Sequence, residues 1–167
     1  SHSRSNGHDL NVGVNYSDDT WMFNASLGVT PQRRTIDRKV GKLYADTAMN
    51  MIDFQPMIWM SWRKKEMRVS LNYNGNTRQP SLSDLMPLTD NSNPLYITRG
   101  NPDLKQMFSH NIRLNFQNSP KGISANLGGQ VEQNSVTQVM IYDVQTGGRE
   151  TYPVNINGNW NLFGGAS

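Results

Sequence analysis

Residues 67–74 read MRVSLNYN, in which apolar Met67, Val69, Leu71 and Tyr73 alternate with polar or basic residues. Successive side chains of a β-strand point to opposite faces, so an alternation of period two separates an apolar face from a polar one. The stretch therefore predicts a β-strand that is apolar on one face and polar on the other.

The same alternation recurs on both sides of this stretch. Further strands are expected at residues 10–16, 21–29, 52–62, 112–117, 123–144 and 154–162. The strand at 123–144 loses its alternation near Asn134 and is too long for one bilayer crossing, so its upper half should project into water. The pattern thus predicts seven strands in an all-β fold, an antiparallel up-and-down meander.

The connections between these strands alternate between short and long. Short polar turns are expected at residues 17–20, 63–66 and 118–121, whereas long polar stretches run over 31–50 and 79–105. Outer-membrane barrels have short periplasmic turns and long extracellular loops. The asymmetry therefore predicts part of a large transmembrane β-barrel in the cell outer membrane of a Gram-negative bacterium.

The aromatic residues support the same interpretation, because Trp and Tyr concentrate where hydrocarbon meets water. The residues expected to form one girdle near the short turns are Tyr16, Trp21, Trp62, Phe116, Trp160 and Phe163. On the other parity Asn, Ser, Gly and Gln prevail over charged residues. Such a face suits a water-filled or plugged lumen, where uncharged groups bond to one another and to water.

The alternation also predicts which side chains face lipid and which face the interior. The lipid-facing set is Val69, Leu71, Leu114, Phe116, Val154 and Ile156, and the interior set is Asn72, Arg113, Asn155 and Asn157. A seven-stranded piece has open edges, here near residues 10–16 and 154–162. We expect these edges to be covered by other barrel strands, by a second copy, by the sheet curling on itself, or by detergent.

Composition excludes several other classes of protein. Only 35% of residues are hydrophobic and the mean hydropathy is -0.66, which is low for a packed globular interior. There is no run of about 18 apolar residues, so no transmembrane helix is expected. The net charge of +3 is modest, and the basic residues lie mainly in two expected connections. That distribution indicates solvated loops and does not favour nucleic acid as a partner.

No arrangement of side chains indicates catalysis. The three histidines are scattered without zinc-ligand spacing, and the chain has no cysteine. Asp84, Asp90 and Asp103 share one long stretch and could hold a cation, but carboxylates that accept hydrogen bonds in turns are the favoured interpretation. We therefore expect no enzyme, no cofactor and no metal site.

The long stretch that begins at residue 78 carries a recognisable motif. It contains RQPSLSDL at 78–85, DNSNPL at 90–95 and GNPDLK at 100–105. This combination resembles the barrels of TonB-dependent receptors, and those of Bacteroidetes are the most similar. The motif positions are Pro80, Ser81, Leu85, Asn93, Pro94, Gly100, Asn101, Pro102 and Leu104. In such a corner Gly100 could take a positive φ, and Pro102 would hold Asn101 extended.

The resemblance implies a function in uptake of a nutrient, such as a siderophore, a glycan or a peptide. Such receptors have barrels of about 22 strands around a plug, whereas seven strands cannot close a barrel and neither a plug nor a TonB-contacting segment is visible. Residues 1–167 are therefore expected to be a single fragment of the barrel domain. The implied partners are outer-membrane lipid, the remainder of the barrel and its plug, TonB through the missing plug region, and a surface lipoprotein.

A second interpretation of the strands remains open at this stage. A soluble antiparallel β-sandwich, acting as a binding or adhesion module of the bacterial envelope, would also alternate apolar and polar residues along each strand. In a sandwich the apolar faces of two sheets cover each other. The two interpretations therefore differ in whether the apolar face is covered by protein.

Overall fold

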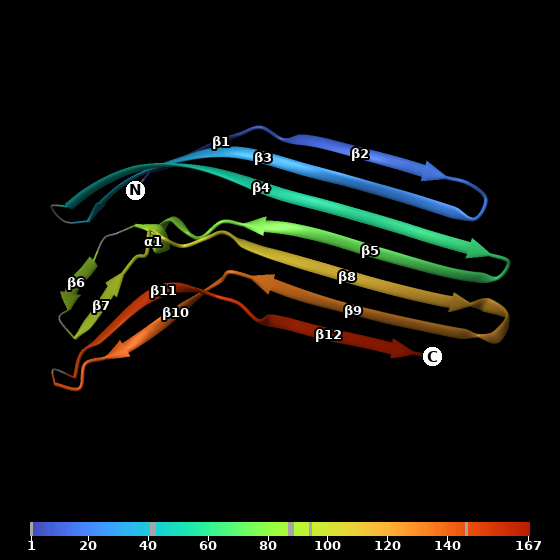
Figure 1. Ribbon diagram of the computed structural model, residues 1–167. Coiled ribbons are helices and arrows are strands. Elements are labelled where there is room, and N and C mark those ends of the chain that lie inside the picture. Colours follow the sequence, from blue (N-terminus) through green and yellow to red (C-terminus); the bar gives the residue numbers. More distant parts are fainter. Residues whose placement is uncertain (1, 41–42, 87–88, 94, 146) are drawn as a thin grey trace.

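The structure is a computed structural model, and it describes residues 2–40, 43–86, 89–93, 95–145 and 147–167. Side-chain environments are described over the same ranges except 2–5, 36–40, 43–47 and 91–92. Most of the chain forms one long sheet, and a smaller sheet lies at one end of it (Figure 1). Antiparallel all-β architecture, the fold class predicted from the alternation, is confirmed for the long sheet.

The long sheet has the order β1-β3-β4-β5-β8-β9-β12, and β2 follows β1 along the same edge of β3. Its strands are β1 (His2–Gly7), β2 (Leu10–Ser17), β3 (Trp21–Val40), β4 (Leu43–Lys64), β5 (Met67–Arg78), β8 (Met107–Asn118), β9 (Ile123–Gln133) and β12 (Asn159–Ala166). The short turns β2–β3, β4–β5 and β8–β9 lie together at the end opposite the smaller sheet (Figure 1). The expected short turns are therefore confirmed in position.

The smaller sheet has the order β10-β11-β7-β6. Its strands are β6 (Thr89–Asn93), β7 (Tyr96–Arg99), β10 (Ser135–Tyr142) and β11 (Arg149–Ile156). A short helix, α1 (Leu82–Leu85), precedes β6, and the 3-10 turn Ser119–Lys121 joins β8 to β9. Among the described residues, no helix has the length and apolar character needed to cross a membrane.

The register of the long sheet gathers the apolar side chains on one face. Leu71 lies opposite Met60 on one side and opposite Leu114 on the other, and Leu114 in turn lies opposite Leu127. Directly opposite residues share a face, so the apolar parity continues from strand to strand. The lipid-facing placement predicted for Val69, Leu71, Leu114 and Phe116 is thus consistent with the register.

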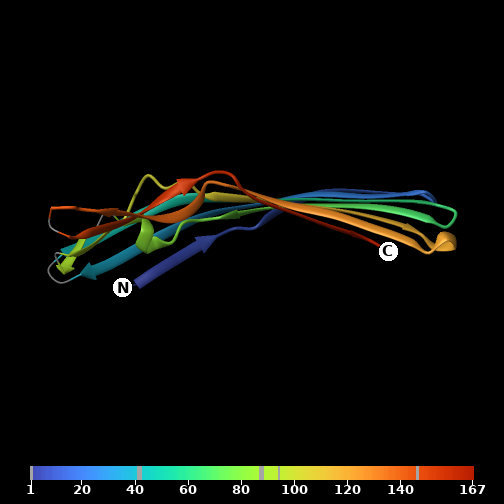
Figure 2. The same ribbon diagram turned by 90° about the horizontal axis from the view of Figure 1, so that it is seen from below.

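No described strand or helix covers this apolar face. Val12, Leu114 and Leu127 are 74%, 41% and 50% exposed, and the long sheet appears as a single layer when seen from below (Figure 2). A sandwich would bury these residues against a second sheet. The described structure therefore contradicts the sandwich interpretation and leaves an apolar band of the kind that contacts lipid.

The aromatic girdle near the short turns is present in part. The rings of Trp21 and Trp62 lie 6.4 Å apart, and Trp62 is level with Val69 and Phe116 on the next two strands. Two of the expected members lie elsewhere. Trp160, the second residue of β12, lies opposite Val131, toward the end away from the short turns, and Phe163 has the parity of the polar face.

The opposite face of the long sheet is rich in amides. One row across it runs through Asn15, Asn24, Trp59, Asn72, Arg113, Gly128 and Phe163. Neighbouring side chains bond to one another, as when the Nδ2 amide of Asn115 donates to the hydroxyl of Ser70 at 3.3 Å. This face therefore satisfies much of its hydrogen-bonding capacity without charge.

The expectation of a loop at residues 31–50 is wrong. β3 and β4 continue as a hairpin, with Gln32 opposite Met51 and Arg34 opposite Met49. The alternation of apolar and polar residues is absent from this stretch, because a strand that projects into water needs no apolar face. The expected loop at 79–105 is partly structured too, since it contains α1, β6 and β7.

The two last expected strands each divide at a residue with a left-handed backbone. Asn134 has φ 55° and separates β9 from β10, which confirms the predicted break at that position. Gly158 has φ 101° and separates β11 from β12. Val154 and Ile156 therefore belong to the smaller sheet, opposite Thr137 and Ser135. Their assignment to the lipid-facing surface was wrong. The alternation of apolar and polar residues continues through the bend at Gly158, so the sequence does not reveal that the chain changes sheets there.

Both edges of the long sheet are open in the described chain, so the expected covering by a sheet that curls on itself is not found. Within the described chain the outer edges of β2 and β12 pair with no further strand, and the sheet does not curl on itself. The strand at the C-terminal edge is β12, which begins at Asn159 and not at Val154. β1, which extends the N-terminal edge, was not predicted, because its polar sequence has no alternation.

Candidate functional site

The first part of the loop motif forms α1 and its cap. Ser81 is the N-cap: its Oγ accepts a hydrogen bond from the Asp84 backbone N–H at 3.2 Å and donates to the Asp84 carboxylate at 2.6 Å. A serine at this position satisfies a backbone donor that the helix itself cannot. The helix turns Leu85 inward, and both Leu85 and the following Met86 are 3% exposed. Pro80 is also buried.

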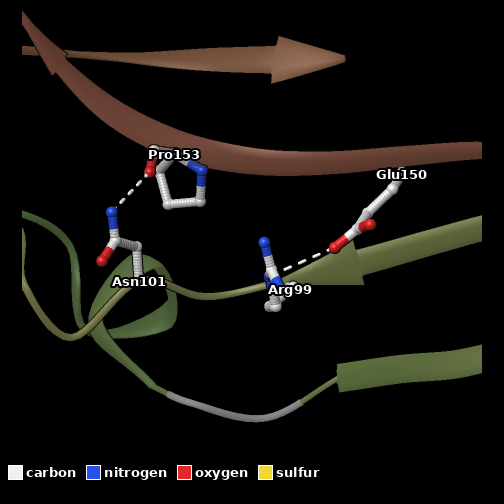
Figure 3. A network of polar contacts seen from close by, with 4 residues as sticks. All are labelled: Arg99, Asn101, Glu150 and Pro153. Atoms are coloured by element: carbon white, nitrogen blue, oxygen red, sulfur yellow. Dashed lines mark hydrogen bonds and ion pairs between the residues drawn. The ribbon is translucent and has the colours of Figure 1, made fainter. Parts of the chain in front are cut away.

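The second part of the motif fastens α1 to the smaller sheet. The backbone N–H of Asn101 donates to the carbonyl of Asp84 at 2.5 Å, and its Nδ2 amide donates to the carbonyl of Pro153 at 3.0 Å (Figure 3). Leu104 and Pro153 are both buried. The motif therefore builds a small core between α1 and β11, outside the long sheet.

Gly100 owes its place in this core to close approach and not to a positive φ. A Cβ atom at this position would collide with the backbone carbonyl of Met86, and Gly100 is not among the described glycines with positive φ. The expectation of a left-handed Gly100 was therefore wrong. Only glycine lets the two backbone segments come this near.

The remaining motif residues lie nearer the surface. Asn93 accepts a hydrogen bond through Oδ1 from the Leu95 backbone N–H at 3.0 Å, which is a turn contact. Pro102 is exposed, and Pro94 lies outside the described residues. The motif thus acts mainly as a structural fastening in the described chain.

The smaller sheet joins two segments that are far apart in sequence. β7 and β11 pair in parallel, with Glu150 opposite Ile97. Arg99 Nε and Glu150 Oε1 form an ion pair of 3.1 Å across these strands (Figure 3). The guanidinium of Arg99 also lies 5.2 Å from the ring centroid of Tyr152, close enough for a cation–π contact.

Asn155 joins the smaller sheet to the long one. Its Oδ1 accepts from the Lys105 backbone N–H at 2.7 Å, and its Nδ2 donates to the carbonyls of Lys105 and Asn134 at 3.0 and 2.8 Å. The Oδ1 of Asn157 accepts from the Asn134 backbone N–H at 2.8 Å. The side chains of these two asparagines therefore form hydrogen bonds with backbone groups at the bend. Their predicted position in the barrel interior was wrong.

Asp53 organises the polar face near the smaller sheet. It accepts hydrogen bonds from the Nε2 amides of Gln32 at 2.6 Å and Gln79 at 2.5 Å. Gln79 also donates to Gln106 at 3.0 Å, while Gln32 accepts from Arg34 Nε at 3.2 Å. A part-buried carboxylate is stabilised by such donors, and here it fixes the positions of two glutamines.

Above this network lies a pocket of about 410 Å³, which we call the mouth pocket. Its lining residues come from β3, the end of β5, α1, β8 and β10, and they are Arg34, Arg78, Gln79, Pro80, Ser81, Asp84, Met107, Val136 and Gln138. Asp84 accepts from Gln138 Nε2 at 3.2 Å across the pocket. The pocket therefore lies between the polar face of the long sheet and the smaller sheet.

Sequence reasoning missed the two arginines of the mouth pocket, because Arg34 was assigned to the loop at 31–50 and Arg78 lay between the expected strand at 67–74 and the loop at 79–105. The signal that could have found them is parity: Gln32 and Arg34 continue the polar positions of β3, and Arg78 continues those of β5. Motif residues Pro80 and Ser81 do line this pocket. The described part of the chain contains no group of three or more His, Cys, Asp or Glu side chains placed to hold a metal ion.

A second, wider groove lies lower on the polar face. It has a volume of about 700 Å³ and is lined mainly by amides, together with Arg113 and Phe163. The Arg113 guanidinium is 5.5 Å from the Phe163 ring centroid, and the ring lies over Gly128, where a Cβ would displace it. Asn72 and Arg113 therefore face the polar side together, as predicted.

The chain resembles known proteins in sequence and in fold. The model of the outer membrane protein beta-barrel family matches residues 12–166. The structure is similar to the crystal structure of the siderophore receptor PirA from Pseudomonas aeruginosa, with a TM-score of 0.60 and 13% identity. That match covers 98% of this chain and 39% of the receptor chain, so the chain spans about two fifths of its structural relative. No curated protein matches it.

The family match extends from β2 to the end of β12 and so includes both faces of the long sheet. An apolar face without a protein cover and an amide-rich face opposite it are the two surfaces of a wall between lipid and a hydrated lumen. The chain belongs to the outer membrane protein beta-barrel family, and its place is the outer membrane of a Gram-negative bacterium.

Proposed function

We propose that the chain is a section of the barrel wall of a TonB-dependent receptor that imports a nutrient across the outer membrane. The observation that carries this proposal is the two-faced sheet, whose apolar face is bare and whose amide face leads to the mouth pocket. The structural relative is a siderophore receptor, and the loop motif at 78–105 resembles receptors of Bacteroidetes. A siderophore, a glycan or a peptide are the nutrient classes that such a receptor would take.

In this proposal each face and edge of the sheet has its own neighbour. The apolar band contacts lipid, and the amide face borders a plug that TonB rearranges. The edges of β2 and β12 pair with further strands of the same barrel, since unpaired backbone groups are costly in lipid. A surface lipoprotein is the proposed partner for the smaller sheet, which would stand outside the cell. In this proposal the chain binds and conducts its ligand without catalysis.

Uptake by whole cells tests the proposed function. The source bacterium and a strain lacking the gene are compared for uptake of labelled siderophores, oligosaccharides and peptides. We expect one class to be lost on deletion, to return with the complete gene, and to be lost again when TonB is removed. Uptake of all three classes at the parental rate in the deletion strain, or uptake that persists without TonB, would refute the proposal.

A further inference from the structure

We propose that the mouth pocket binds an oxyanion that carries at least two carboxylate or phosphate groups, with Arg34 and Arg78 as the residues that contact it. This inference rests on the proposed function, because it names the chemical class of ligand for the same lumen-facing site. It is carried by four features of the pocket: its two arginines, the way nearby acids are occupied, the positioning of Arg34, and its size.

The first feature is that the two arginines share one face. Arg34 on β3 and Arg78 at the end of β5 both have the parity of the polar face, and both line the mouth pocket. The pocket lining contains two positive side chains and a single negative one, Asp84. Its charge is therefore net positive, which attracts anions into a partly enclosed space.

The second feature is that the acidic groups nearby bond to neutral donors. Asp53 accepts from two glutamine amides, and Asp84 accepts from the Ser81 hydroxyl and the Gln138 amide. Among the described side chains, neither Arg34 nor Arg78 forms an ion pair, whereas Arg99 in the smaller sheet pairs with Glu150. The two guanidinium groups are therefore without a carboxylate partner from the described chain.

The third feature is that Arg34 is positioned from behind. Its Nε donates to the Gln32 Oε1 atom at 3.2 Å, and Gln32 is itself held by Asp53. This contact uses the nitrogen nearest the stem and leaves the two terminal amino groups for a ligand. A guanidinium in that orientation can grip a carboxylate or phosphate through two parallel hydrogen bonds.

The fourth feature is the pocket's size and remaining lining. A volume of about 410 Å³ lies within the range of roughly 300 to 1,000 Å³ that is usual for small-molecule sites. Gln79, Gln138 and Ser81 add neutral hydrogen-bonding groups around the two arginines. The site is thus suited to a compact, highly oxygenated anion, while a neutral sugar would leave both arginines unpaired.

Calorimetric titration of the complete receptor in detergent tests the inference. The probes are citrate, pyrophosphate and, as a neutral control, sucrose. We expect at least one of the two anions to bind and its affinity to fall at least about tenfold in Arg78→Gln and in Arg34→Gln, since each substitution removes charge-assisted hydrogen bonds to the ligand. Binding of citrate alone would assign a carboxylate ligand, and binding of pyrophosphate alone a phosphate.

The matched control is Arg33→Gln, which removes the same charge from the neighbouring position on β3 but on the other face. It should leave anion affinity unchanged, and Arg78→Lys should retain part of it. Heat-modifiable gel mobility verifies that each variant is folded. Absence of binding by both anions, a tighter sucrose complex that ignores Arg78, or an equal loss in Arg33→Gln would each overturn the inference.

The uptake experiment separates this inference from the proposed function. Anion binding through Arg78 in a protein without TonB-dependent uptake would retain the pocket assignment and refute the transport proposal. TonB-dependent uptake by a receptor that binds neither anion would retain transport and refute the assignment of ligand class.

Discussion

Leu71 of β5 and Leu114 of β8 lie directly opposite each other, on the face of the long sheet that no described element covers. The next residue on β8, Asn115, points to the other face. Its Nδ2 amide donates a hydrogen bond to the Ser70 hydroxyl at 3.3 Å. Two adjacent positions on one strand therefore face lipid and lumen respectively, which gives a direct test of how the wall is oriented.

Arginine substitution distinguishes these two positions. Leu114→Arg should destabilise the folded barrel by about 2 kcal/mol, because a charge on the lipid face costs roughly 2 to 4 kcal/mol at the midplane and less near the interfaces. Asn115→Arg should cost much less, since its side chain can reach water. The measurement is reversible urea unfolding of the complete protein in lipid vesicles. Equal costs at the two positions would contradict the assignment of faces.

Accessible tags test which end of the wall lies outside the cell. A tag inserted at Asn91, in the smaller sheet, should react with an impermeant reagent on intact cells, whereas a tag at Lys64, in the β4–β5 turn, should not. Both tags should react after the cells are permeabilised, which controls for expression. Labelling of Lys64 on intact cells would reverse the proposed topology. The equivalent site at Lys42 lies outside the described residues.

Two glycine-to-alanine substitutions should differ sharply. In Gly100→Ala the new methyl group meets the backbone of Met86, which cannot move without opening α1, and overpacking of this kind costs about 1 to 3 kcal/mol. In Gly128→Ala it meets the tip of the Phe163 ring, which can rotate away. Limited proteolysis should therefore cut residues 82–104 faster in the first variant only. Similar cleavage in both would argue against the close approach at Gly100.

The bend between the two sheets depends on the Asn155 amide. Asn155→Asp keeps the acceptor for the Lys105 N–H but loses both donors and places a carboxylate beside two carbonyls. A loss of about 1 to 3 kcal/mol is expected locally, visible as faster hydrogen exchange in β10 and β11. Asn157→Asp is the matched control, because the Oδ1 of Asn157 acts as an acceptor for Asn134 and an aspartate preserves that role.

The turn between β2 and β3 should be sensitive to acid. Asp18 accepts from the backbone N–H groups of Thr20 and Trp21 at 2.8 and 2.6 Å and from the Tyr16 hydroxyl at 2.7 Å. These bonds, that from Tyr16 foremost, hold the pKa of Asp18 below its usual range. A carboxyl with a lowered pKa stabilises the fold above its unfolded pKa and loses that contribution as pH falls through the folded pKa.

Substitution of Asp18 should show this dependence directly. Asp18→Ala should lower the urea midpoint at neutral pH, and the difference from the parent should shrink once the pH drops below the normal range of an aspartate. Asp19→Ala, the same change one residue later, is the control and should lower the urea midpoint less. A deficit in Asp18→Ala that persists unchanged at low pH would exclude the carboxylate as its cause.

The parts of the fold that border lipid were predictable from the sequence. In the segments that border lipid, such as residues 10–16 and 67–73, an apolar side chain stands at every second position, so strand, face and turn can be inferred from parity alone. Above the bilayer that pattern ends. β3 continues past Pro31 with polar residues on both faces, and the alternation that would reveal a strand is absent.

The candidate site was less predictable, for a related reason. The motif at 78–105 could be recognised, but its role depends on contacts such as that between Asn101 and Pro153, which are 52 residues apart. A pattern within a few neighbouring residues cannot predict a contact between residues so far apart in the sequence. Arg34 and Arg78 become neighbours of one pocket only when the smaller sheet folds over the end of the long one, so their shared role could not be inferred from either strand alone.

The parallel pairing of β7 with β11 has a mechanical consequence for the end of the wall that carries the smaller sheet. It couples two protrusions that leave the wall at different strands, so a force applied to one is transmitted to the other through backbone hydrogen bonds. Two of the bends that connect this unit to the wall, β9–β10 and β11–β12, coincide with the left-handed residues Asn134 and Gly158. A molecule that binds to either protrusion therefore applies force to both of them, and the two protrusions move as one unit about these bends.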